Sequence, residues 1–160
     1  MATLSLHQAY KKVNNDQGKS YELAQSTVLG LQGILSCWMR QADRLEAFKG
    51  NQNPEFALHV KFDLSTGFEV VSVNDYGHLQ LDAVSLYLLF LVQAIASGLQ
   101  VIGTAHEVAF VQNLVFYVER AYRTPDFGTW ERGSIYNDGT PEVHASSIGM
   151  AKAALEAING

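Results

Sequence analysis

Several residue types and sequence patterns are scarce in this chain of 160 residues, and each scarcity argues against a class of structure or function. Cys37 is the only cysteine, so no internal disulfide can form, which fits a reducing compartment. The net charge is −5 and basic residues form no run, which argues against nucleic acid as a partner. No apolar run reaches the roughly 18 residues that cross a bilayer. The N-terminal residues lack the basic and apolar regions of a secretory signal.

Metal and cofactor motifs are lacking as well. The five histidines are scattered without the spacing of metal ligands, and no phosphate-binding loop or nucleophile triad is present. We therefore expect no metal site and no cofactor. Apolar residues make up 48% of the chain and charged residues 17%, which is enough for a core and too little charge for a disordered chain. The length predicts one domain over residues 1–160 with no internal boundary.

Apolar residues recur at three- and four-residue steps along most of the chain, which predicts a mainly α-helical fold. The stretch over residues 83–96 is apolar around almost its whole circumference and is therefore expected to be a core helix. Thr104 and Glu107 have the spacing of a helix capping box. Polar and apolar residues alternate over residues 57–73, which predicts a small β-hairpin on the helical body. The predicted helices cover residues 2–13, 20–48, 83–96, 104–122 and 144–158.

Residues 125–133, Pro-Asp-Phe-Gly-Thr-Trp-Glu-Arg-Gly, have the composition of a functional loop. Pro125 and Gly128 indicate a turn. The ring of Trp130 can stack on a sugar, and it can desolvate Glu131 and raise the pKa of that carboxyl group, which suits a general acid in glycosidic cleavage. From the residues alone a second interpretation stays open. Trp130 then serves as a packing anchor, and Glu131 pairs with Arg132 or Arg120.

Three stretches of the chain resemble the glucoamylase-type glycoside hydrolases. Residues 77–83, Gly-His-Leu-Gln-Leu-Asp-Ala, resemble the Gln-x-Asp helix start of these enzymes, and residues 125–133 resemble their Trp-Glu loop. Residues 144–157 resemble the helix that follows this loop. The order of the three stretches matches as well, which favours the interpretation of the Trp-Glu loop as an inherited sugar-site element.

The resemblance to the regulatory subunits of glycogen phosphorylase kinase is closer still. It extends from about residue 2 to residue 160 and is highly specific from Tyr76 onward. Met39-Arg-Gln-Ala-Asp, together with residues 120–128, favours the beta type over the alpha type. The stretches that carry the family likeness most clearly are residues 82–91, 107–119 and 149–158.

The resemblance implies a glucoamylase-like (α/α)6 barrel, of which this chain is expected to be a fragment near the N-terminal end. It also implies a non-catalytic subunit that controls glycogen breakdown by restraining a separate kinase subunit. The implied partners are the catalytic subunit, the alpha-type subunit and calmodulin. The implied location is the cytoplasm, or the cytoplasmic face of the plasma membrane if the full-length protein carries the family's C-terminal prenyl anchor. The chain ends at Asn159-Gly160 without a prenylation signal.

Two other functions remain open, an active glucan or trehalose hydrolase and an inert helical fragment. By resemblance Glu131 occupies the general-acid position, which is expected to be vestigial here. Inverting hydrolysis needs a second carboxylate about 6.5–9.5 Å away to activate water. The residues give no reason to place Asp82, Asp126 or Glu142 there. We expect a glucan site that binds an oligosaccharide without cleaving it, formed by Tyr76, His78, Trp130 and Glu131.

Overall fold

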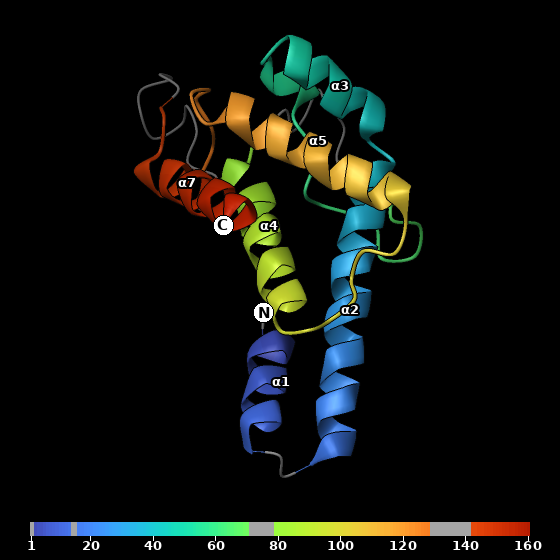
Figure 1. Ribbon diagram of the computed structural model, residues 1–160. Coiled ribbons are helices and arrows are strands. Elements are labelled where there is room, and N and C mark those ends of the chain that lie inside the picture. Colours follow the sequence, from blue (N-terminus) through green and yellow to red (C-terminus); the bar gives the residue numbers. More distant parts are fainter. Residues whose placement is uncertain (1, 14–15, 71–78, 129–141) are drawn as a thin grey trace.

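The protein folds as a set of packed α-helices, as the apolar periodicity predicts. The structure, a computed structural model, describes residues 2–13, 16–70, 79–128 and 142–160. None of the helices in these ranges is long and apolar enough to cross a membrane. Most of the described residues lie in helices, so the predicted mainly helical class is confirmed. The elements are α1 (Ala2–Val13), α2 (Gln17–Met39), α3 (Ala42–Gly50), the short 3-10 helix η1 (Pro54–Phe56), α4 (Leu81–Ala96), α5 (Ala105–Ala121) and α7 (Ala145–Asn159) (Figure 1).

Helix α4 lies at the centre of the fold and packs against α2, α5 and α7 (Figure 1). Seven of its 16 residues are buried, a larger share than in any other described helix. Leu88, near its middle, has no exposed surface. The core helix predicted over residues 83–96 is confirmed, because a helix that is apolar on every side gains most when other helices surround it.

Helices α1 and α2 form an antiparallel pair whose lower half extends below the rest of the fold in Figure 1. His7 Nδ1 lies 3.0 Å from the carbonyl oxygen of Ser20, which joins the two helices. Lys11 Nζ donates to the carbonyl oxygen of Ser97 at 2.8 Å, and Gln8 donates to the hydroxyl of Ser97 at 2.7 Å. These bonds tie α1 to the C-terminal end of α4.

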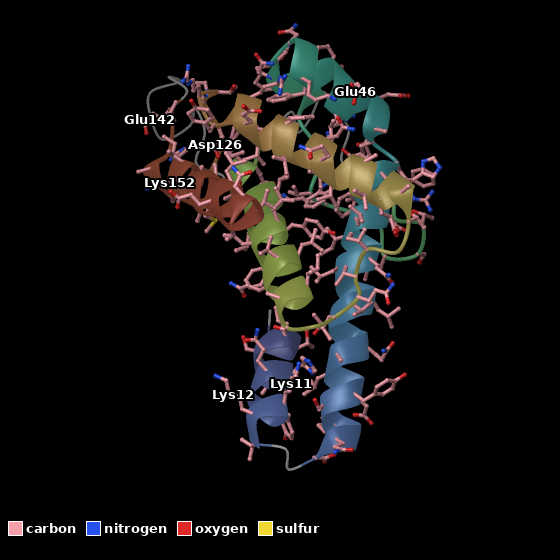
Figure 2. All side chains as sticks on the ribbon, viewed as in Figure 1. Lys11, Lys12, Glu46, Asp126, Glu142 and Lys152 are labelled. Carbon is pink, nitrogen blue, oxygen red and sulfur yellow. The ribbon has the colours of Figure 1, made fainter. Side chains whose placement is uncertain are left out.

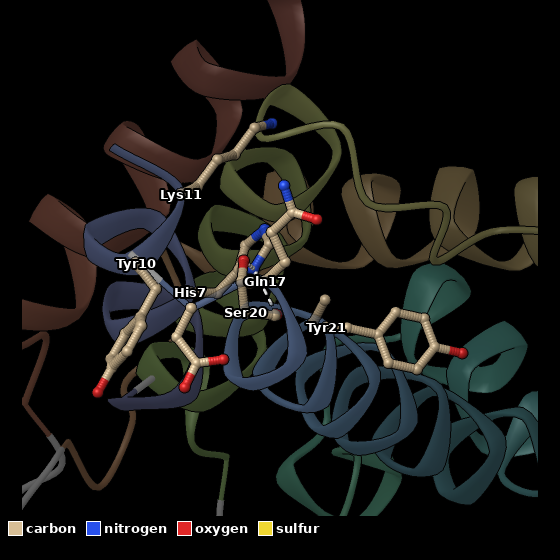
Figure 3. Close-up of a pocket in the computed structure, with 8 residues that line it drawn as sticks. His7, Tyr10, Lys11, Gln17, Ser20 and Tyr21 are labelled. Carbon is tan, nitrogen blue, oxygen red and sulfur yellow. Dashed lines mark hydrogen bonds between the residues drawn. The ribbon is translucent and has the colours of Figure 1, made fainter. Parts of the chain in front are cut away.

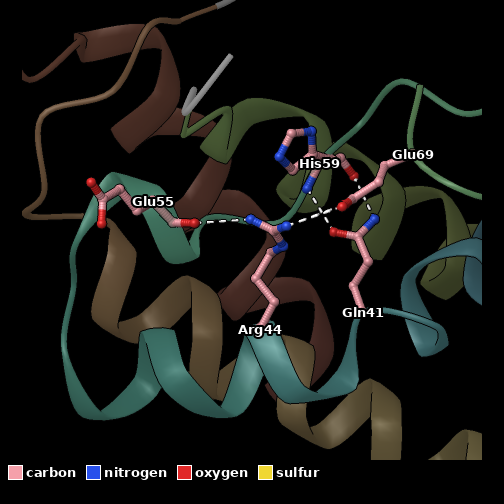
Figure 4. A network of polar contacts seen from close by, with 5 residues as sticks. All are labelled: Gln41, Arg44, Glu55, His59 and Glu69. Atoms are coloured by element: carbon pink, nitrogen blue, oxygen red, sulfur yellow. Dashed lines mark hydrogen bonds and ion pairs between the residues drawn. The ribbon is translucent and has the colours of Figure 1, made fainter. Parts of the chain in front are cut away.

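The single helix predicted over residues 20–48 is wrong, because a turn at residues 40–41 divides it into α2 and α3. The side chain of Gln41 accepts from the backbone N–H of His59 at 2.8 Å and donates to the carbonyl oxygen of His59 at 3.2 Å (Figure 4). Trp38 Nε1 donates to the same carbonyl at 2.9 Å. Since all three bonds are buried, they favour the turn over a continuous helix.

A second set of polar contacts fixes the segment after α3 (Figure 4). Arg44 donates from one guanidinium nitrogen to the carbonyl oxygen of Glu55 at 2.9 Å. From another it donates to the Glu69 carboxylate at 3.1 Å. Burial lowers the pKa of the His59 imidazole beside this network. The network attaches η1 and the residues around Glu69 to α3.

The predicted β-hairpin over residues 57–73 is wrong, since the described residues contain one isolated antiparallel bridge, Phe62 to Glu69, and no strand. The turn between them is well defined. Asp63 Oδ1 accepts from the backbone N–H groups of Ser65 and Thr66 at 3.0 and 2.8 Å. Gly67 has a φ of 70°. The turn chemistry is therefore present without a ladder, because the residues around it are largely exposed and no sheet face is buried. Residues 71–73 lie outside the described ranges.

Candidate functional site: a buried polar cluster between α4 and α7

The four residues expected to form the glucan site, Tyr76, His78, Trp130 and Glu131, all lie outside the described residues. Their positions remain predictions. The residues that flank them are described, however. Residues 79–80 follow the first segment, and residues 125–128 and 142–144 stand on either side of the second.

Backbone hydrogen bonds join these flanking residues. Phe127 donates its N–H to the carbonyl oxygen of Leu79 at 3.0 Å, and Asp126 donates its N–H to the carbonyl oxygen of Glu142 at 3.1 Å. Gly128 lies against the ring of His144, so that a Cβ at Gly128 would come within 3.1 Å of the ring. Leu79, which follows the first segment, therefore lies beside the residues that flank the second, although Leu79 and Phe127 are 48 residues apart in sequence.

Asp126 is the most unusual of the flanking residues, because it is a carboxylate with only 3% of its surface exposed. It lies beside the N-terminal end of α7 (Figure 2). Ser147 Oγ, in the first turn of α7, donates to Asp126 Oδ2 at 2.6 Å. His144, at the N-cap position of α7, makes no side-chain capping bond. The Asp126 side chain thus accepts a hydrogen bond in the first turn of a helix whose N-cap residue makes no side-chain capping bond.

The environment of Asp126 favours its protonated form. Burial raises the pKa of this carboxyl group above its ordinary value of 3.8, and the charge of Asp82 acts in the same direction. The hydrogen bond from Ser147, the nearby His144 and the backbone N–H of Gly128 oppose the rise in pKa without cancelling it. This carboxyl group therefore carries a desolvation cost, and no lysine or arginine of the described residues forms an ion pair with it.

Gln80 Oε1, Asp82 Oδ1 and His144 Nε2 are buried polar atoms on the same elements, and none of them has a hydrogen-bond partner among the residues that the structure describes. Gln80 is 8% exposed and precedes α4 without capping it. Such atoms usually find a partner in folded proteins. Two of the three atoms are acceptors, so a donor such as a hydroxyl group or a water molecule would satisfy them. We call Gln80, Asp82, Asp126, His144 and Ser147 the buried polar cluster.

Asp82, Asp126 and Glu142, the three carboxylates considered as a possible second catalytic group, lie in different environments. Asp82 and Asp126 both belong to the cluster, whereas Glu142 is exposed and contributes only its backbone carbonyl (Figure 2). Sequence reasoning missed His144 and Ser147. The signal for Ser147 was a polar residue on the buried side of α7, in register with Ala151 and Ala154. The described residues hold no group of three or more acidic, His or Cys side chains placed to bind a metal ion.

A separate cavity of about 320 Å³ lies between α1 and α2 (Figure 3). Tyr10 and Tyr21 point away from each other on its two sides, and His7, Gln17 and Ser20 lie between them. His7 already contacts Ser20, and Lys11 is bonded to Ser97. Its main polar groups thus serve the packing of the α1–α2 pair, which leaves the buried polar cluster as the better candidate.

The chain is similar to known proteins over nearly its whole length. The family model for glycosyl hydrolases family 15 matches residues 1–160. The chain is 67% identical over 159 residues to the probable phosphorylase b kinase regulatory subunit beta of Drosophila melanogaster. It is 54% identical over 162 aligned residues to the corresponding subunit alpha of the same organism. It is 52% identical to the liver isoform of the alpha subunit of Oryctolagus cuniculus.

Each of these alignments covers 99% of this chain, but only 14% of the beta relative and 13% of the two alpha relatives. The chain therefore spans a small part of the length of the relatives it matches. The predicted resemblance to phosphorylase kinase regulatory subunits is confirmed, and so is the predicted relationship to the glucoamylase-like glycoside hydrolases. The identity to the beta relative exceeds that to the two alpha relatives, as the beta-type motifs predict.

Proposed function

Because this chain belongs to glycosyl hydrolases family 15, we propose that it is a saccharide-binding part of a phosphorylase kinase regulatory subunit and not a hydrolase. The observation that carries the proposal is the 67% identity, over nearly the whole chain, to a relative named as a regulatory subunit beta. Family membership alone does not decide activity, because the same fold supports many functions. The name of the relative describes a protein of which this chain covers 14%, so the regulatory role of the chain itself is a proposal.

In this proposal the chain contributes to restraining a separate catalytic subunit, in contact with that subunit and with an alpha-type subunit. Calmodulin binding and a prenyl anchor are implied by the resemblance for the longer protein. A cytoplasmic location is implied in the same way. The net charge of −5 fits a protein partner better than nucleic acid.

A kinase assay tests the regulatory role. The purified chain is added to the catalytic subunit of phosphorylase kinase, with and without an alpha-type subunit, and the phosphorylation of phosphorylase b is followed. We expect the chain to bind the subunits and to lower the rate. The control is the Leu88→Asp variant, whose charge in the core should prevent folding. If the chain neither binds a subunit nor changes the rate, the proposal is wrong.

The saccharide site is proposed at Tyr76, His78, Trp130 and Glu131. Support comes from the backbone bond between Phe127 and Leu79, which brings the flanks of both loops together. Aromatic rings would stack on a glucose unit while Glu131 accepts bonds from its hydroxyl groups. Cleavage is not expected, because a general acid without a base lacks the group that activates water.

Titration with maltoheptaose tests this site through the fluorescence of Trp130. The other tryptophan, Trp38, is 2% exposed and should report little of a surface event. We expect a fluorescence change that Tyr76→Ala abolishes and that Tyr21→Ala, at an exposed tyrosine on α2, leaves unchanged. Glucose release is measured in the same samples. Release that Glu131→Gln abolishes would establish the hydrolase instead, and the absence of binding would remove the saccharide site.

A further inference from the structure

We propose that the turn formed by residues 62–70 docks onto another protein, whose contact surface is an apolar pocket with a carboxylate at its rim. We call residues 62–70 the docking turn. Its apolar anchors are Leu64 and Phe68, and the group that meets the partner's carboxylate is the guanidinium of Arg40. That the partner is a subunit of phosphorylase kinase rests on the proposed function.

The docking turn carries an apolar surface that the rest of the described chain leaves uncovered. The exposed fractions of Leu64, Phe68 and Val70 are 103%, 57% and 55%. Adjacent residues of an extended chain point to opposite sides, so Phe68 and Val70 lie on the side opposite to Glu69, which faces Arg44 (Figure 4). Single exposed apolar residues are ordinary, but a group of them on one turn is typical of an interaction surface.

Leu64 stands where a turn usually has a polar residue or glycine. Its neighbours Asp63, Ser65, Thr66 and Gly67 follow that preference. A side chain that is fully exposed buries no apolar surface and so adds no hydrophobic stabilisation to the fold. Packing of this chain therefore gives no reason for a leucine at position 64, whereas contact with a partner does.

Hydrogen bonds within the docking turn fix its shape before any partner binds. The Thr66 hydroxyl donates to Asp63 Oδ1 at 2.9 Å, in addition to the two backbone N–H groups that bind this oxygen. The N–H of Asp63 donates to the carbonyl oxygen of Phe68, and the N–H of Gly67 donates to that of Asp63, both at 2.8 Å. Because the turn is already ordered, little conformational entropy is lost when its side chains enter a partner's pocket.

The docking turn is also attached to the body of the protein. The ring of Phe62 packs edge-on against Trp38 with the ring centroids 6.4 Å apart, and Glu69 pairs with Arg44 at 3.1 Å. Gly67 lies so close to α2 that a Cβ there would come within 3.3 Å of Cys37 Sγ. Leu64 and Phe68 therefore project from a fixed base.

Arg40 supplies the charge beside these anchors. Its guanidinium carbon lies 4.8 Å from the centroid of the Phe68 ring, and it forms no ion pair with an acidic side chain of the described residues. The two carboxylates of the turn are engaged, since Asp63 accepts bonds within the turn and Glu69 binds Arg44. A planar guanidinium can donate two parallel N–H bonds to one carboxylate of a partner.

A hollow of about 220 Å³ beside Phe68 indicates how much of the partner enters there. It is smaller than the roughly 300–1,000 Å³ of a small-molecule site, so it fits one partner side chain better than a separate ligand. Arg40 and Asp43 both line it. Because the charge of Asp43 opposes further negative charge, the docking turn suits a single carboxylate and not an acidic patch.

Biolayer interferometry with the full chain tests the docking turn against the catalytic subunit and the alpha-type subunit of phosphorylase kinase. The variants are Leu64→Ala and Arg40→Glu. Leu29→Ala is the control for the first, because Leu29 is a 66% exposed leucine on α2. Lys152→Glu is the control for the second, because it reverses an exposed cation on α7. Leu64→Ala should unfold in urea as the parent does, since Leu64 buries no surface.

We expect Leu64→Ala to weaken binding to one of the two subunits at least about tenfold, because a few anchor residues carry most of the binding energy of an interface. Arg40→Glu should slow association with the same subunit, and this difference from the parent should shrink as salt rises above about 0.1 M. Leu29→Ala and Lys152→Glu should bind as the parent does.

Four results would overturn the proposal. If the parent binds a subunit and Leu64→Ala binds equally well, the docking turn is refuted while the regulatory role stands. If Arg40→Glu binds like Lys152→Glu, the partner's carboxylate is refuted. If sedimentation shows self-association that Leu64→Ala abolishes, the turn is an interface between two copies of this chain. If the parent binds neither subunit, the docking turn and the proposed function are refuted together.

Discussion

The hydroxyl of Tyr117 offers the sharpest test of how the segment after α3 is held in place. Tyr117 lies on α5 and is fully buried, and its ring centroid is 4.5 Å from that of Phe48. The backbone N–H of Leu58 donates to its hydroxyl oxygen at 3.1 Å. Leu58 itself is 1% exposed. In Tyr117→Phe the ring contacts remain, but this buried N–H loses its acceptor where water has little access.

The expected cost follows from that unsatisfied donor. Leaving a buried hydrogen-bonding group without a partner costs about 1–3 kcal/mol. Tyr87→Phe is the matched control, since its hydroxyl donates to the carbonyl oxygen of Leu31 at 3.3 Å. That carbonyl lies inside α2 and keeps its helical hydrogen bond after the change. The control should therefore cost less, about 0.5–1 kcal/mol.

Urea unfolding followed by far-ultraviolet circular dichroism measures both variants, with the slope m checked for constancy. The reasoning predicts that Tyr117→Phe lowers the free energy of unfolding by more than Tyr87→Phe. Equal losses, or a Tyr117→Phe variant as stable as the parent, would show that the Leu58 N–H has another partner and that residues 57–59 are held by other contacts.

Three further predictions concern the core, a helix cap and a titrating group. Leu88→Ala should lower the free energy of unfolding by about 2–5 kcal/mol, because Leu88 has no exposed surface; a loss below about 1 kcal/mol in urea unfolding would contradict its central position. Thr104→Ala should cost about 1 kcal/mol by the same measurement, because Thr104 caps α5 at the N–H of Glu107. Asp126 binds its proton more tightly in the folded than in the unfolded chain, so its contribution to stability is full below the ordinary pKa of 3.8 and is lost as the pH rises through the raised pKa. Relative to Asp126→Asn, the parent should lose stability over that window, and urea midpoints whose difference does not change with pH would refute this.

Much of the helical framework follows from residues that are close together in the chain. The capping box at Thr104 and Glu107 is present as predicted, with bonds in both directions. The last helix, predicted over residues 144–158, is α7 (Ala145–Asn159). The core helix over residues 83–96 is α4. Caps and apolar periods act over three or four residues, so the sequence contains all that is needed to predict them. The family also follows from the sequence, because its motifs are short runs of residues in a fixed order.

The tertiary structure decided the features that depend on distant partners. The break between α2 and α3 depends on Gln41 and His59, which are 18 residues apart. The pairing of Asp126 with Ser147 spans 21 residues. The residues around each member of these two pairs do not indicate its partner, since any polar side chain of suitable length could make the same hydrogen bond. For Tyr76, His78, Trp130 and Glu131, the structure contributes only the positions of their flanking residues. Local patterns determine which residues are helical, but burial in a packed core determines which polar groups must find each other, because only there does a missing partner cost free energy.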